Sequence, residues 1–176
     1  MSHPVFYGSI IKNLAFLEQM AHGSKPMVDY YQSNLNLSPD LGDYFSEFEY
    51  KHSEYEEFLK TSVSDYLIQC ASKTRIIQDS NDFKADDPND KESFDKYSGV
   101  ATCIEGTVDL SIRECCNKII HAKEVSLKFI DLDSGTAKYW NGVCVLKGDK
   151  YGNEWHIELD IKKWVLAMSL YHQKIG

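Results

Sequence analysis

The hydrophobic positions in the first two-thirds of the chain repeat at the spacing of an α-helix. Between residues 9 and 23, apolar side chains recur every three or four positions, at Ile10, Leu14, Leu17 and Ala21. This spacing predicts an amphipathic helix that ends near Gly23, followed by a short helix and a loop over residues 27–37.

The sequence Ser38-Pro39-Asp40 is typical of a helix start. From there to about residue 77 one long helix, or two in sequence, would bury Leu41, Phe45, Phe48, His52, Tyr55, Leu59 and Tyr66.

After residue 121 the period of the pattern changes to two. Residues 125–129 and 155–159 alternate apolar with polar side chains, and residues 139–146 are aromatic and β-branched. Turn-forming residues at 131–135 and 148–152 separate these segments, which predicts three antiparallel strands with one buried face. Asp160 can cap a last helix that covers the sheet. The pattern therefore predicts an α+β fold, with a mainly helical N-terminal two-thirds, a three-stranded antiparallel meander and a C-terminal helix.

Length and composition favour one domain. The 176 residues, 43% of them hydrophobic, suffice for one core, so we expect a single domain over residues 1–176. Residues 79–98 differ from the rest, because they hold seven acidic residues against three lysines. This composition predicts an acidic loop at 79–98. Residues 99–107 could include a short extended piece.

Charge and cysteine usage narrow the function classes. The chain has 19 basic and 27 acidic residues, a net charge of −8, which disfavours sequence-independent binding to DNA or to anionic membranes. It contains no apolar run long enough to span a bilayer and no signal-like start, so we expect a cytoplasmic protein. The five cysteines follow no C-x-x-C spacing, which predicts reduced thiols. We expect no cofactor and no metal ion.

Residues 111–121 contain the side chains that are best suited to form a catalytic or binding site. Ser111 and Glu114 have the spacing of a capping box, which supports a helix start. On such a helix Arg113, Asn117 and His121 lie four residues apart, and they therefore share one stripe. The three residues are therefore candidate site residues, because they would place a permanent cation, an amide and a titratable imidazole side by side.

The run Arg-Glu-Cys-Cys-Asn-Lys-Ile-Ile-His-Ala resembles the signature helix of HEPN domains (higher eukaryotes and prokaryotes nucleotide-binding), in which an arginine, often followed by asparagine, precedes a histidine. His121 and Asn117 match the family positions, whereas the family spacing places the arginine at Cys116 and Arg113 lies one turn earlier. The resemblance implies a dimeric, all-helical, metal-independent endoribonuclease. In it the 2′-hydroxyl attacks the adjacent phosphate, His121 transfers protons, Arg113 binds the phosphate and Asn117 orients it.

The same residues also fit a structural role. An imidazole at a helix C-terminus is favoured by the helix dipole, Arg113 could pair with an acid, and Asn117 could bond to the backbone.

Two functions of the protein therefore stay open. The first is a non-catalytic interaction or regulatory protein, which binds a protein partner or a second copy through its acidic surface and helical face. The second is the HEPN-like ribonuclease, with RNA as its partner.

A metal site at His52 is less favoured. His52 and Glu56 lie four residues apart and could supply two metal ligands, but no third ligand is apparent. We expect His52 to be a hydrogen-bonded core residue instead.

Overall fold

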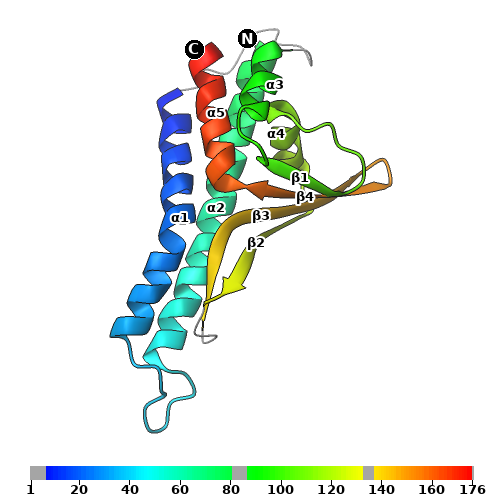
Figure 1. Cartoon of the computed structure of the whole chain (residues 1–176). Helices are drawn as coiled ribbons and strands as arrows, with labels where there is room; N and C mark the ends of the chain where they lie inside the picture. The colour runs from blue at the N-terminus through cyan, green and yellow to red at the C-terminus, as the bar shows by residue number, and fades with distance from the viewer. Residues whose placement is uncertain (1–6, 81–86, 133–136, 176) are drawn as a thin grey trace.

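The computed structural model describes residues 7–80, 87–132 and 137–175. These residues form five helices and a four-stranded antiparallel sheet in the order β1-β4-β3-β2 (Figure 1). The elements, in chain order, are α1 (Tyr7–Asn34), α2 (Glu47–Ser80), α3 (Pro88–Asp95), β1 (Ala101–Glu105), α4 (Ile112–His121), β2 (Glu124–Asp131), β3 (Lys138–Lys150), β4 (Asn153–Asp160) and α5 (Ile161–Ile175). The mixed helix and strand composition that the sequence predicts is confirmed.

The sheet has one strand more than the sequence predicts. The antiparallel meander β2-β3-β4 is present, but β1 adds a fourth strand beside β4, with Ala101 opposite Leu159 and Cys103 opposite Ile157. The prediction of three strands was therefore wrong. Strand β1 lies within residues 99–107, where the sequence allowed a short extended piece, but its five residues are too few for an alternating pattern that would predict a strand of the sheet. Its pairing with a strand far along the chain is a tertiary contact, which local propensity does not encode.

Helix α1 does not end at Gly23, as predicted, but continues through Pro26 to Asn34. A proline inside a helix removes one backbone hydrogen bond and costs about 3 kcal/mol. Buried contacts on both sides of Pro26 offset this cost. Val28 is 1% exposed, and the buried Ser24 hydroxyl accepts a hydrogen bond from the Trp140 amide at 3.0 Å.

Helix α2 is one long helix, but it begins at Glu47 rather than near residue 38. A capping box at Ser46 sets this start. The Glu49 amide donates to Ser46 Oγ at 3.1 Å, and the Ser46 amide donates to Glu49 Oε2 at 2.7 Å. The predicted start at 38–40 was wrong, and Leu41 and Phe45 lie exposed in the connection before the helix.

The acidic segment 79–98 is not a loop throughout, because α3 lies inside it. Asp87 caps this helix by accepting a hydrogen bond from the Asn89 amide at 2.9 Å, and Pro88 occupies the first helical turn. Phe94 is buried and joins α3 to the core. Residues 81–86 of this segment, and residues 133–136 of the predicted turn at 131–135, lie outside the described residues.

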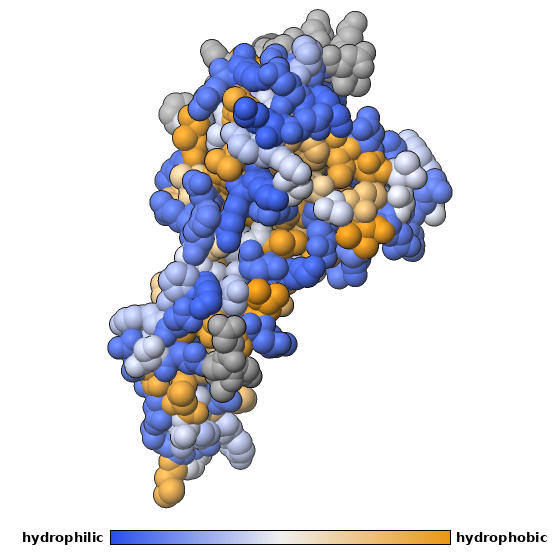
Figure 2. Space-filling view, in the orientation of Figure 1, coloured by the Kyte–Doolittle hydropathy of each residue, from blue (hydrophilic) through white to orange (hydrophobic). Residues whose placement is uncertain are grey.

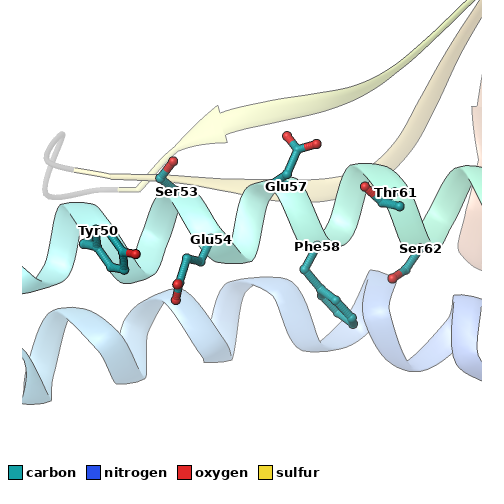
Figure 3. A pocket seen from close by; sticks show the side chains of 7 residues that line it. All are labelled: Tyr50, Ser53, Glu54, Glu57, Phe58, Thr61 and Ser62. Carbon is teal, nitrogen blue, oxygen red and sulfur yellow. The ribbon is translucent and has the colours of Figure 1, made fainter.

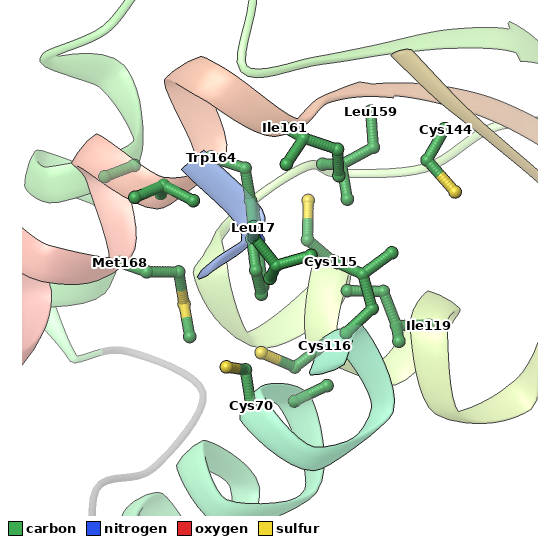
Figure 4. Close-up of a cluster of buried hydrophobic side chains, with 14 of the residues drawn as sticks. Leu17, Cys70, Cys115, Cys116, Ile119, Cys144, Leu159, Ile161, Trp164 and Met168 are labelled. Atoms are coloured by element: carbon green, nitrogen blue, oxygen red, sulfur yellow. The ribbon is translucent and has the colours of Figure 1, made fainter. Parts of the chain in front are cut away.

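The main core lies between the sheet and the helices. Trp164 of α5, Leu17 of α1 and Cys116 of α4 meet there (Figure 4). All five cysteines are free thiols, and burial raises the pKa of Cys70 and Cys144 to about 12. The four buried thiols, Cys70, Cys115, Cys116 and Cys144, therefore serve as small apolar packing groups rather than as nucleophiles.

A second, smaller cluster of buried residues lies beside the half of the α1–α2 hairpin that is next to the connection between the two helices. It joins Val28 of α1 and Phe48 of α2 to Leu132, which follows β2, and Ala137, which precedes β3. A ring nitrogen of His52 is 2.7 Å from the Lys138 carbonyl oxygen and ties α2 to β3, in the structural role that the sequence favours. We call this half of the hairpin, with its connection at residues 35–46, the arm; it forms the narrow lower part of the molecule in Figure 2.

Candidate functional site

Two side chains hold the N-terminus of α4. Ser111 Oγ accepts a hydrogen bond from the Glu114 amide at 3.1 Å, as the capping spacing predicts. Asp90 of α3 accepts from the amides of Ile112 and Arg113 at 2.8 and 2.7 Å. Burial raises the pKa of Asp90, although these amide hydrogen bonds oppose the shift. The position of α4 is therefore fixed from α3 as well as by its own cap.

The Arg113 guanidinium lies at the N-terminal end of α4 and faces the C-terminal end of α2. Arg113 Nη2 is 2.9 Å from Asp79 Oδ1, and Arg75 Nη1 is 3.2 Å from the same oxygen. The Arg113 side chain is 25% exposed. The predicted phosphate-binding cation therefore has a carboxylate partner, as in the structural role that the sequence leaves open.

Asn117 and His121 line one open pocket of about 490 Å³ at the C-terminal end of α4. His121 is exposed, and the side-chain amide of Asn117, through Nδ2, donates a hydrogen bond to Glu114 Oε2 at 3.1 Å. Arg113 does not line this pocket. The eight positions from Arg113 to His121 correspond to about 12 Å along the helix axis. The structure thus brings together two of the three predicted site residues and leaves Arg113 apart.

Two lysines that sequence reasoning did not single out, Lys118 and Lys150, line the same pocket. Lys118 Nζ lies 4.3 Å from the centroid of the Trp155 ring and 3.4 Å from Glu114 Oε1. Trp155 packs closely on Gly148, where any Cβ atom would clash with the indole ring. Lys118 lies three residues before His121 and therefore close to the same helix face, which is the signal that could have found it.

The pocket has the groups to receive an anion. Lys150 supplies positive charge, and His121 adds an exposed imidazole, whereas Lys118 is buried and already paired with Glu114. Tyr151, 95% exposed, stands at the rim in the β3–β4 turn, where its φ of +55° is uncommon for a residue other than glycine. Asp149 lowers the net positive charge of the lining.

A second candidate site lies on the arm. Six large apolar side chains gather there although each is more than half exposed, and five carboxylates lie among them. Figure 2 shows hydrophobic residues at this lower end of the molecule. We call this set the arm surface; it comprises Leu37, Leu41, Tyr44, Phe45, Tyr50 and Phe58 with Asp40, Asp43, Glu47, Glu54 and Glu57.

Sequence reasoning missed the arm surface because it assigned two of its apolar residues to a buried stripe and did not single out the other four. Leu41 and Phe45 fit the period of the following helix, and a periodic pattern does not show whether a partner element covers it. The capping box formed by Ser46 and Glu49 could have revealed that the helix begins after both residues.

Comparisons with protein-family models, with curated proteins and with solved structures find no match for this chain. The HEPN resemblance therefore stays a prediction. Within the described residues, no helix is long and apolar enough to cross a membrane. The same residues contain no group of three or more histidine, cysteine or acidic side chains that could hold a metal ion.

Proposed function

We propose that this protein is a non-catalytic interaction module that binds a protein partner through the arm surface. The observation that carries the proposal is the concentration of exposed apolar side chains on the arm. Single exposed apolar residues are common on soluble proteins, but a contiguous group rimmed by polar residues is typical of an interaction site. Aromatic side chains dominate this group, and tyrosine and phenylalanine are enriched in binding interfaces.

The charge of the arm surface favours a protein partner. Its five carboxylates would be repelled by phosphates of nucleic acid or by anionic lipids. The buried apolar residues of the arm already pack against the ends of β2 and β3, so they do not cover the exposed side chains of the arm surface. A partner chain bound to the arm surface would bury these side chains.

Selection from a phage-displayed library of random peptides against the immobilised full chain tests the proposal. We expect peptides whose binding falls about ten-fold or more when Tyr50 and Phe58 are both replaced by alanine, because truncating central aromatic anchors costs more than 1 kcal/mol each. Both side chains are exposed, so the double variant should keep its fold.

Ile11→Ala is the matched control, because Ile11 is 62% exposed, as is Tyr50, but lies near the start of α1. It should leave peptide binding unchanged. If every selected peptide binds the double variant and the wild type equally, the arm surface is not a binding surface and the proposal is wrong.

RNA cleavage is a second candidate function. The observation that favours it is the open pocket in which His121 and Asn117 lie with Lys118 and Lys150. His121 would act as general acid and base, and Asn117 would orient the phosphate. Because Arg113 is paired with Asp79 and Lys118 with Glu114, Lys150 would take the role of the phosphate-binding cation.

Cleavage of single-stranded RNA by wild type and by His121→Ala, with EDTA present, tests this function. Removing a general acid–base group should lower the rate by about 100-fold or more. His121 is exposed, so the substitution should not disturb folding. Equal rates in the two proteins would remove His121 from the mechanism, and an undetectable rate in the wild type would remove the activity itself.

A further inference from the structure

A shallow groove of about 690 Å³ runs along α2 within the arm. Its seven lining residues are spaced by three and four positions, and they therefore form one stripe about 18 Å long. Figure 3 shows them in two rows, with Glu54 and Phe58 on the side of α1 and Glu57 on the side of the strands. The lining consists of Tyr50, Ser53, Glu54, Glu57, Phe58, Thr61 and Ser62.

Two aromatic side chains, Tyr50 and Phe58, provide the large apolar contact surfaces of the groove. Tyr50 is 62% exposed and Phe58 is 55% exposed. They lie eight residues apart on α2, which corresponds to about 12 Å along its axis. Side chains at positions i and i+7 or i+8 of a partner helix have nearly the same separation, so a helix laid along α2 could place one apolar side chain on each ring.

The groove continues into a second hollow of about 470 Å³, which shares Tyr50 with it. Glu54 and Glu57 line the first hollow, and Asp40, Asp43 and Glu47 line the second. One lysine, Lys51, lies among them, and its Nζ is already 2.7 Å from Glu54 Oε2. The apolar groove is therefore bordered by negative charge along both hollows.

We propose that the arm surface binds an amphipathic helix of a partner protein whose polar face carries lysine and arginine. The apolar face of that helix would contact Tyr50 and Phe58, and its basic side chains would meet the carboxylates at the rim. A second copy of this chain is a poorer fit, because face-to-face pairing would set these carboxylates against each other. This inference rests on the proposed function and names the class of partner.

Two synthetic helical peptides with the same leucine stripe test the proposal. One carries lysine on its polar face and the other carries glutamate. We expect the full chain to bind the lysine peptide at least about ten-fold more tightly by fluorescence anisotropy, because opposite charges attract and like charges repel across the groove. Raising the salt concentration should weaken the lysine complex, because exposed charges are screened.

Single substitutions locate the binding. Phe58→Ala should raise the dissociation constant of the lysine peptide about ten-fold. Glu57→Lys should weaken the lysine peptide and strengthen the glutamate peptide. Ile11→Ala should change neither. Circular dichroism of each variant checks that the helices are retained.

Three results would overturn the inference. The first is equal affinity for the two peptides, and the second is a lysine complex that neither Phe58→Ala nor Glu57→Lys weakens. The third is a concentration-dependent dimer that Phe58→Ala abolishes, because a second copy would then be the occupant. The library selection separates this failure from failure of the proposed function. Acidic or extended peptides that depend on Tyr50 and Phe58 would leave the arm surface as a binding site and reject the basic helix.

Discussion

Replacing Trp164 with alanine should lower the free energy of unfolding by about 3–5 kcal/mol. Trp164 is 0% exposed, and Figure 4 places its ring among Leu17 of α1, Cys115 of α4 and Met168 of α5. Loss of the indole would leave a cavity where three helices meet. Urea unfolding followed by far-ultraviolet circular dichroism measures the effect.

Trp164→Phe should cost clearly less than the alanine substitution. Phenylalanine keeps much of the buried ring area, and within the described residues Trp164 Nε1 has no hydrogen-bond partner to lose. An alanine variant within about 1 kcal/mol of the wild type would contradict this account of the core, because large-to-small changes at packed aromatic positions cost several times more.

Acidification from about pH 6.5 to about pH 4 should remove up to about 3 kcal/mol of stability through His172 alone. Burial lowers the pKa of His172 from 6.5 to about 4. In this interval the unfolded chain binds a proton at this histidine and the folded chain does not, so the folded state loses stability as the pH falls. His172 lies against the rings of Tyr7 and Tyr171, and its Nε2 is 3.0 Å from Thr74 Oγ1.

Unfolding midpoints of wild type and His172→Gln across this pH range measure the effect. The glutamine variant should lose less stability on acidification than the wild type does. Asp90, whose pKa burial raises, works in the opposite direction, because its ionisation in the folded state is disfavoured as the pH rises. Parallel pH profiles for the two proteins would show that His172 is not buried in its neutral form.

The parts of the fold that were predicted correctly are those with strong local signals. The cap at Ser111, the alternation of Trp155, Ile157 and Leu159, and the stripe of the last helix each depend on neighbours within a few residues. The errors fall where distant contacts override a local signal. Pro26 and Gly23 favour a helix end, yet burial of Val28 against residues of the second half of the chain keeps α1 continuous.

The candidate sites divide in the same way. The sequence places Arg113, Asn117 and His121 on one helix, and α4 is that helix. It does not show that Asp79 at the end of α2 pairs with Arg113, or that Lys150 at the end of β3 lines the same pocket as His121. These contacts join residues that are far apart along the chain, and they decide which side chains share a pocket.

Local patterns in the chain are enough to predict the helical and alternating segments, the helix that ends at His121 and the acidic net charge. Long-range contacts produce the fourth strand, the continuous α1 and the separation of Arg113 from His121. It also left Tyr50 and Phe58 exposed on the arm. Periodicity and capping are properties of a few consecutive residues, whereas exposure depends on which distant elements cover a side chain.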